Sequence, residues 1–153
     1  MGFISVSGIG CAGRTKALAA LTGLILVSAA PPGEVDLGIS GQRSAKGLIR
    51  ICLTRDPAHF PGCTDDPAAQ KRSVPARQSA LRFEGVPSGA YAVSLFHDEN
   101  ANGRLDTMLG IPREGFGFSR NPPIRFGPPR FAAARFAVTS GAAQQQVRLK
   151  YLL

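Results

Sequence analysis

Residues 97–130 contain a group of polar side chains whose types and spacing could bind a metal ion. Oxygen-bearing side chains recur around Gly103 at four positions: Asp98, Asn100, Asn102 and Asp106. Counted from Asp98, they take the first, third, fifth and ninth positions of a calcium-binding loop, and Arg104 takes the seventh, which donates its backbone carbonyl. Oxygen ligands suit calcium and not thiophilic metals. We therefore predict a calcium site formed by Asp98, Asn100, Asn102, Arg104 and Asp106.

The calcium loop is incomplete by the same count. Its twelfth position, where a bidentate glutamate closes such loops, is Leu109. A closing carboxylate would have to come from Glu99 or Glu114. The alternative is a tight Asn102-Gly103 turn, in which the same Asp and Asn side chains accept hydrogen bonds from their own backbone. Both interpretations stay open from the sequence.

Residues for catalysis are not evident beside this loop. His97 precedes Asp98, but neighbouring side chains leave an extended strand on opposite faces. The chain contains no Gly-x-Ser-x-Gly nucleophile motif and no phosphate-binding glycine loop. Asp98 and Asp106 could serve as paired acids, but nothing in the sequence fixes their separation. We predict a non-catalytic binding or structural module; a hydrolytic enzyme that uses His97 and the loop carboxylates is the alternative.

Arginine and phenylalanine recur together after the loop, once every five residues. The pairs are Arg125-Phe126, Arg130-Phe131 and Arg135-Phe136, with Arg120 five residues earlier. Such a stripe could bind anionic polysaccharide or lipid headgroups, which is a further alternative function. The simpler expectation is that the phenylalanines enter the core while the arginines extend over it. Phe116 and Phe118 are also expected in the core, because their spacing suits one face of a strand.

The amino-terminal residues have the composition of a signal peptide. Arg14 and Lys16 precede an uncharged run at residues 17–30, and small residues suited to cleavage lie at residues 27–29. This run is shorter than the roughly 20 residues of a membrane-spanning helix. We therefore expect a cleaved signal peptide at residues 1–29 and a single domain without a transmembrane span at residues 30–153. The protein would be exported to the periplasm or the cell exterior.

Two of the three cysteines follow the expected signal peptide. Cys52 and Cys63 form an even pair in a chain expected to reach an oxidising compartment, so we predict a disulfide between them. A zinc site that adds His59 would lack a fourth ligand and the usual ligand spacing.

The composition is basic, with a formal net charge of +8 at pH 7. Net positive charge favours association with anionic surfaces, although it identifies no particular site. For an exported protein, the expected partners are an anionic envelope surface or polysaccharide, and nucleic acid is not expected.

Alternating hydrophobic residues predict strands along the rest of the chain. Val35, Leu37 and Ile39 indicate a first strand, and residues 46–54 a second that we expect to pair with the first. The proline-rich residues 55–76 are expected to form a loop with at most one helical turn.

The clearest strand pattern follows the turn at residues 86–89. Tyr91, Val93, Leu95 and His97 share one face, and the opposite face is small and mostly apolar, so both faces should be covered. Residues 134–138 and 147–153 give the last two strands. Because no long segment has helical periodicity, we predict an all-β chain, a single antiparallel β-sandwich of about seven strands of transthyretin-like or immunoglobulin-like type.

The sequence FEGVPSGAYAVSLFHD resembles the hairpin of transthyretin-like and carboxypeptidase-regulatory-like sandwiches. The matching positions are Phe83, Val86, Pro87, Gly89, Tyr91 and Val93. This resemblance implies a hairpin with the tyrosine packed at its corner.

From about Gly47 to the end, through HDENANGRLDTMLGIPREGFGFSRNP and GPPRF, the sequence is similar to a bacterial family of small exported proteins. The family is known as domain of unknown function 2141. The resemblance implies export and a β-rich domain, and it implies no established activity.

Overall fold

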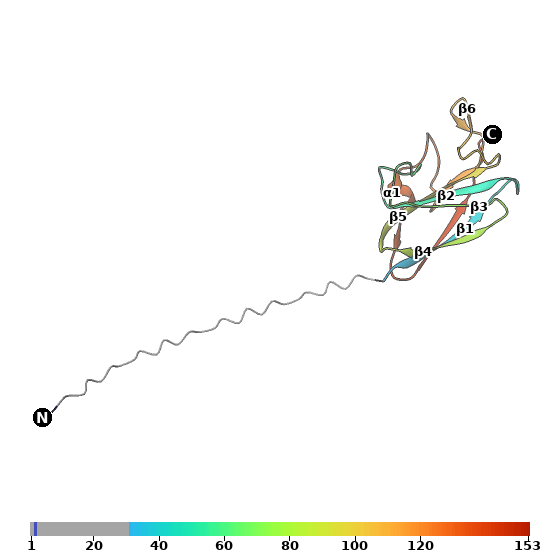
Figure 1. The fold of residues 1–153 in the computed structure, drawn as a ribbon. Coiled ribbons are helices and arrows are strands. Elements are labelled where there is room, and N and C mark those ends of the chain that lie inside the picture. The colour runs from blue at the N-terminus through green and yellow to red at the C-terminus, as the bar shows by residue number, and fades with distance from the viewer. Residues whose placement is uncertain (1, 3–30) are drawn as a thin grey trace.

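The computed structural model describes residue 2 and residues 31–153. Apart from Gly2, the expected signal peptide at residues 1–29 lies outside the described residues (Figure 1). Strands dominate the described part, and its one helix, α1 (Phe131–Ala134), has four residues. No helix in this part is long and apolar enough to cross a membrane. The prediction of a mainly β structure is confirmed.

One sheet has three strands in the order β10-β1-β4. Their bounds are β1 (Gly33–Ser40), β4 (Ala80–Val86) and β10 (Ala142–Arg148). The central strand β1 pairs antiparallel with β4 but parallel with β10, so the predicted antiparallel arrangement is wrong for this pair. Val35, Leu37 and Ile39 are buried and alternate with less buried residues, as expected for a strand with one face in the core.

A second sheet has the order β3-β2-β5-β8, and β9 pairs with the amino-terminal end of β5. The bounds are β2 (Leu48–Thr54), β3 (Gln70–Pro75), β5 (Gly89–Asp98), β8 (Phe116–Phe118) and β9 (Phe136–Val138). β5 pairs antiparallel with β2, β8 and β9. It is therefore the strand around which this sheet is built.

The main apolar core contains side chains from both sheets. Its most deeply buried members are Val35, Leu37, Ile49, Leu53, Phe83, Val86, Val93, Val138 and Val147. They come from β1, β4 and β10 of the first sheet and from β2, β5 and β9 of the second. Removal of apolar surface from water is the dominant favourable term in folding, so this cluster holds the two sheets together.

A second apolar cluster includes side chains on the other face of β5. Its buried members are Ala92, Phe116, Phe118 and Ala134, and the partly buried Phe60, Phe96, Leu105, Ile124 and Phe131 pack against them. Most of these residues belong to loops and to the short elements β8 and α1. The prediction that β5 is covered on both faces is confirmed, but only one of the covers is a sheet.

A small hairpin projects from the segment between β5 and β8. It consists of β6 (Thr107–Met108) and β7 (Ile111–Pro112), joined by Leu109 and Gly110, which both have positive φ. Figure 1 places β6 beside the carboxyl terminus. Arg43 connects the two regions, because its guanidinium donates to the main-chain oxygens of Arg113 at 3.0 Å and Leu153 at 2.9 Å.

Two predicted strand pairings are wrong. β2 pairs with β3 and β5 and not with β1. β4 pairs with β1, whereas β5 belongs to the other sheet, so residues 86–89 connect two sheets and do not close a hairpin. Hydrophobic alternation records which face of a strand is buried, but it does not record the partner strand.

The number and bounds of the strands also differ from the prediction. Residues 31–153 contain ten strands instead of about seven, because β6, β7 and β8 are short and β3 has little hydrophobic signal. β3 lies in the segment expected to be a loop, at the edge of its sheet, with mostly exposed side chains. β10 begins at Ala142, earlier than expected, and residues 149–153 follow it.

Candidate functional site

The polar loop after β5 begins at an ion pair between Arg50 and a buried carboxylate, that of Asp98. Asp98 is fully buried, and its Oδ2 accepts hydrogen bonds from Nε of Arg50 and the N–H of Gly103, both at 2.9 Å. Its Oδ1 accepts the N–H of Asn102 at 2.9 Å. The sheet register places Arg50 opposite Phe96, so Asp98, two residues further, is its diagonal neighbour on the same face. One cation and two backbone donors thus satisfy the buried carboxylate.

The other end of the loop is held by Asp106 and Glu114. Asp106 accepts the side-chain amides of Asn102 at 2.9 Å and Asn100 at 2.7 Å, and these hydrogen bonds lower its pKa below the ordinary value. The buried Glu114 accepts the N–H of Glu99 at 2.9 Å and the N–H of Asp106 at 3.0 Å. Glu114 therefore fastens the start of the loop to its end.

The structure brings together the residues predicted to bind calcium. Arg104 donates its N–H to Oδ1 of Asn102 at 2.8 Å, and the side chains of the other four accept or donate the hydrogen bonds given above. Hydrogen bonds of Asp and Asn to their own loop are the pattern that the turn interpretation predicts. The described residues contain no group of three or more His, Cys, Asp or Glu that could hold a metal ion. Calcium binding by this loop stays a prediction.

His97 is fully buried on the opposite face of β5 from Asp98. Its Nε2 donates to the carbonyl of Lys46 at 2.7 Å, because a carbonyl can only accept. Its Nδ1 lies 2.7 Å from the hydroxyl of Tyr151. The ring therefore fastens the residues before β2 and after β10 to the central strand.

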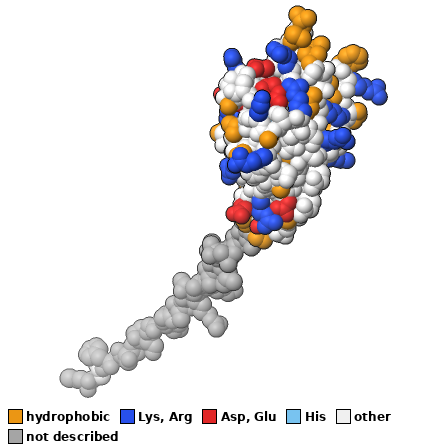
Figure 2. Space-filling view, turned by 90° about the vertical axis from the view of Figure 1, so that its right-hand side faces the viewer, with side chains coloured by type: hydrophobic (Ala, Val, Ile, Leu, Met, Phe, Trp, Pro, Cys, Tyr) orange, Lys and Arg blue, Asp and Glu red, His pale blue; other side chains and the backbone are white. Residues whose placement is uncertain are grey.

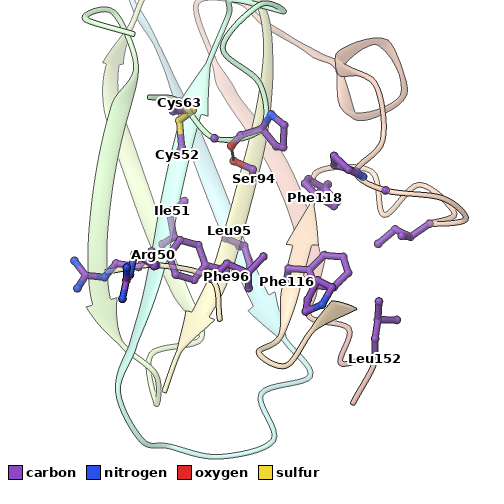
Figure 3. A pocket seen from close by; sticks show the side chains of 18 of the residues that line it. Arg50, Ile51, Cys52, Cys63, Ser94, Leu95, Phe96, Phe116, Phe118 and Leu152 are labelled. Carbon is purple, nitrogen blue, oxygen red and sulfur yellow. Dashed lines mark hydrogen bonds between the residues drawn. A yellow bond between two sulfur atoms is a disulfide. The ribbon is translucent and has the colours of Figure 1, made fainter. Parts of the chain in front are cut away.

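A cavity of about 810 Å³ lies on the outer face of the β2-β5-β8 sheet, the face turned away from the main core (Figure 3). Outward side chains form its floor: Cys52, Ser94, Phe96, Phe116 and Phe118. The register pairs Phe96 with Phe116 and Ser94 with Phe118. Cavities of a few hundred to a thousand cubic ångströms are typical of small-molecule sites. This cavity is therefore the strongest candidate for a binding site in the described chain.

Loops form the walls of the cavity. They are residues 103–105 of the polar loop, residues 110–112 at the β6–β7 hairpin, and residues 124–128. Figure 3 shows Arg50 and Leu152 on opposite sides of the cavity. The predicted disulfide between Cys52 and Cys63 is present, with a Cα–Cα distance of 6.4 Å, and it attaches the loop after β2 to the floor.

The charged side chains around the cavity are all basic. They are Arg50, Lys71, Arg104 and Arg125; Arg72 also lines the cavity, but its guanidinium lies over the ring of Phe83, on the other face of the sheet. None of the described lining residues is Asp or Glu. Arg50 is fixed by Asp98 and by Ser73, whose hydroxyl lies 3.2 Å from Nη1. Within residues 31–153, the structure gives no ion pair for Lys71, Arg104 or Arg125. A concave apolar surface with charges of one sign attracts ligands of the opposite sign.

Residues 37–146 match the family described as "Uncharacterized protein conserved in bacteria (DUF2141)". The chain belongs to this family. The family resemblance found in the sequence is thereby confirmed. The matched residues include the polar loop and every cavity-lining residue except Leu152. No curated protein and no solved structure matches the chain.

The sequence of this DUF2141 member did not reveal the cavity. Phe116 and Phe118 are buried, as expected, but their rings belong to the outer cluster and line the cavity. The available signal was that Arg50, Cys52 and Phe96 occupy outward strand positions. These positions predict a shared surface only when the pairing register is known, because the register brings them next to one another.

The repeated Arg-Phe pairs lie in three different environments. Phe136 belongs to the main core, and the half-buried Phe131 packs edge-on against Phe60 with ring centroids 5.8 Å apart. Phe126 is fully exposed at the wall of the cavity. The expectation that these phenylalanines enter the core is therefore wrong for Phe126, because it lies in a loop rich in proline and glycine and not on a strand.

Proposed function

We propose that the protein binds an anionic amphiphile in the cavity. The ligand class is a single apolar chain with a carboxylate, sulfate or phosphate head group. The observation that carries the proposal is an apolar, aromatic floor whose charged neighbours are all basic. A neutral apolar ligand would not use the cations, and a polysaccharide would bring many hydroxyl groups to an apolar floor that offers them few hydrogen-bond partners.

The floor provides the site for the apolar chain. Phe116 and Phe118 are about nine-tenths buried and pack with ring centroids 6.0 Å apart, so their positions are set by the sheet. Phe96 lies beside them and is partly exposed to the cavity. Each methylene group that a ligand buries contributes about 0.8 kcal/mol, so a chain of several methylenes is needed for measurable affinity.

The head group would contact the basic residues at the rim. Arg50 is the best oriented of these, because Asp98 and Ser73 hold its guanidinium against the edge of the floor. A planar guanidinium matches a carboxylate or phosphate through paired hydrogen bonds. Lys71 and Arg104 are exposed and add positive charge at the same cavity.

A displacement assay tests this proposal. A fluorescent fatty-acid analogue is bound to purified protein and displaced by ligands of equal chain length that carry a carboxylate, a sulfate, a hydroxyl or a trimethylammonium head group. We expect the two anionic ligands to bind at least tenfold more tightly than the alcohol, which corresponds to about 1.4 kcal/mol. Equal affinity for all four, or no displacement by any of them, contradicts the proposal.

Three variants locate the site. Phe96→Glu places a carboxylate on the floor, and Lys71→Glu reverses an exposed charge at the rim without disturbing the core. Both should weaken binding of the anionic ligands, Phe96→Glu the more strongly. Ala132→Glu, on the exposed side of α1, makes the same kind of charge change outside the cavity and should leave affinity unchanged. Equal effects of all three variants would show that only net charge matters.

We also propose that the protein is exported and has no catalytic role. The Cys52–Cys63 disulfide supports export, since such bonds persist in oxidising compartments. The contacts of both His97 nitrogens with protein groups support a structural role for that residue. Mass spectrometry of the envelope fraction tests export, with a mature species that starts near residue 30 as the expected result and one that begins at Met1 as the contradiction.

The two sheets and their shared core support our proposal of a transthyretin-like or immunoglobulin-like sandwich. An experimental structure tests it. Two sheets packed face to face with their strands within about 30° of one another are expected, and crossed or separate sheets contradict it.

Calcium binding by the polar loop is the second proposed function. Its support is the concentration of oxygen ligands between Asp98 and Asp106, with Glu114 close to both ends of the loop. Calcium that binds only the folded protein stabilises it by about 2.7 kcal/mol at a hundredfold excess over Kd. Wild-type protein should then melt at a higher temperature in calcium than in chelator, and Asp106→Asn should lose this difference. Identical melting in both conditions would leave the loop as a hydrogen-bonded turn.

A further inference from the structure

Large apolar side chains project into solvent at two loops that wall the cavity. On the β6–β7 hairpin, Leu109 is 96% exposed, Met108 49% and Ile111 44%. Phe126, on residues 124–128, is also fully exposed. Ile111 and Phe126 line the cavity themselves, and Met108 and Leu109 belong to the same hairpin as Ile111. We call these four residues and the arginines beside them the mouth surface.

Arginines accompany each apolar group of the mouth surface. Arg104 and Arg113 flank the hairpin in sequence, and Arg125 precedes Phe126. All three side chains are exposed, and within residues 31–153 the structure gives none of them an ion pair. Figure 2 shows hydrophobic side chains projecting at the top of the domain in that view, with Lys and Arg side chains near them.

We propose that the mouth surface docks on an anionic lipid bilayer, with Leu109 and Phe126 inserted between the head groups. Single apolar side chains at the tips of loops can enter the boundary between head groups and acyl chains, while neighbouring cations contact anionic lipids. The mouth surface has both features on the same loops: apolar side chains that can enter the bilayer and arginines that can contact anionic lipids.

Charge argues against a second copy of the chain as the occupant of this surface. A two-fold dimer would bring the same patch of each copy together, and therefore the same arginines against one another. The protein as a whole is also basic, with a formal net charge of +8. An anionic bilayer instead supplies the opposite charge to every arginine of the patch.

Docking on a bilayer goes beyond binding of an amphiphile and does not require an occupied cavity. The mouth surface consists of exposed loop tips, whereas the floor consists of outward strand residues. If both proposals hold, the opening of the cavity faces the bilayer, which is a source of anionic amphiphiles. The two proposals share Arg104 and Arg125, but they can fail independently, because Phe96 and Lys71 carry only the first and Leu109 only the second.

The absence of tryptophan from the sequence allows a direct test. Phe126→Trp places one reporter at the tip of its loop, and Ala132→Trp places one on the exposed side of α1 as a control. Vesicles of phosphatidylglycerol and phosphatidylcholine should shift the emission of the first variant to shorter wavelength and leave the second unchanged. Equal shifts in both variants, or no shift at Phe126→Trp, would overturn the proposal.

Vesicle sedimentation then measures the contribution of each residue. Leu109→Asp and Phe126→Asp alter fully exposed side chains, so both variants should fold, and each should lower the partition coefficient at least tenfold. Ala132→Asp makes an equal charge change at an exposed position away from the loops and should bind as wild type does. Binding should be weaker at high salt, because salt screens exposed charges. It should be absent with pure phosphatidylcholine, which has no net charge to attract the arginines.

Two further results decide between docking and the alternatives. The cavity variant Phe96→Glu should still bind vesicles even if it no longer binds the amphiphile. If it loses vesicle binding as well, lipid is held through the cavity, and docking by the mouth surface is overturned. Sedimentation equilibrium without lipid should give a monomer. A dimer that Leu109→Asp dissociates would assign the surface to a second copy of the chain and overturn the proposal.

Discussion

The two faces of the central strand β5 are both mostly apolar but have different covers. Tyr91, Val93 and Leu95 point into the main core, where the first sheet packs against them. Ser94 and Phe96 point outward, beside Phe116 and Phe118 of β8, where loops and α1 cover the sheet and a cavity of about 810 Å³ remains. The inner face is sealed by a sheet, and the outer face keeps a cavity beneath its loops.

The difference shows how a cavity arises without a gap in the hydrophobic pattern. Two sheets present regular rows of side chains that interdigitate, so the space between them is filled. Loops present side chains at irregular spacing, and the loops over β5 also carry Gly103, Gly110 and Gly127 at the wall, which fill no space. An apolar face covered by such loops becomes a binding surface more readily than a core.

Truncation of one phenylalanine in the main core and one on the outer face of the second sheet gives the largest expected contrast. Phe83→Ala, in the main core, should lower the free energy of unfolding by about 3–5 kcal/mol, because the side chain is fully buried. Phe96→Ala, on the outer face, should cost less than half as much and should weaken amphiphile binding. Denaturant unfolding and the displacement assay measure the two effects. Equal destabilisation would mean that the outer face is a second core.

The loop after β2, which covers part of the outer face, is attached by the disulfide as well as by the packing of Phe60. Cys52 and Cys63 are separated by 11 residues, and in the chain-entropy model a loop of this size stabilises the protein by about 3 kcal/mol. The double variant Cys52→Ser with Cys63→Ser should therefore unfold at lower denaturant concentration. Reduced wild-type protein is the matched control and should behave like the variant. No difference from oxidised wild type would show that packing alone holds this loop.

Arg50 connects the outer face to the polar loop. Arg50→Met keeps the apolar stem but leaves the fully buried Asp98 without its cation, which we expect to cost about 2 kcal/mol of stability. The same variant should weaken binding of an anionic head group. Lys71→Met, at the exposed rim, should affect binding alone. Arg50→Met with unchanged stability would show that the backbone donors suffice for Asp98.

The smallest expected effect concerns the pH dependence of the polar loop. The amides of Asn102 and Asn100 lower the pKa of Asp106 below its ordinary value of 3.8. A carboxyl group with a lower pKa in the folded state contributes stability above its unfolded pKa, and this contribution disappears as pH falls through the folded value. Asp106→Asn should therefore flatten the loss of stability below about pH 4. Asp65→Asn, an exposed residue outside the loop, is the control, and equal flattening by it would contradict the assignment.

Local sequence chemistry determined much of what the structure contains. The alternation in β1 and β5, the Cys52–Cys63 pair and the compact polar loop around Gly103 were all predicted, because each depends on residues close in sequence or on compartment chemistry. The family assignment also follows from sequence similarity. These features need no knowledge of which strands are neighbours.

The tertiary structure alone decided which strands pair and what covers each face. β2 could pair with β1 or with β5 by its own pattern, and the edge strand β3 has no hydrophobic pattern that marks it as a strand. The cavity depends on the strand pairing, because the pairing of β2, β5 and β8 brings Arg50, Phe96 and Phe116 side by side. Strand pairing is settled by packing between residues far apart in the chain, so the site exists only once the sheet has formed.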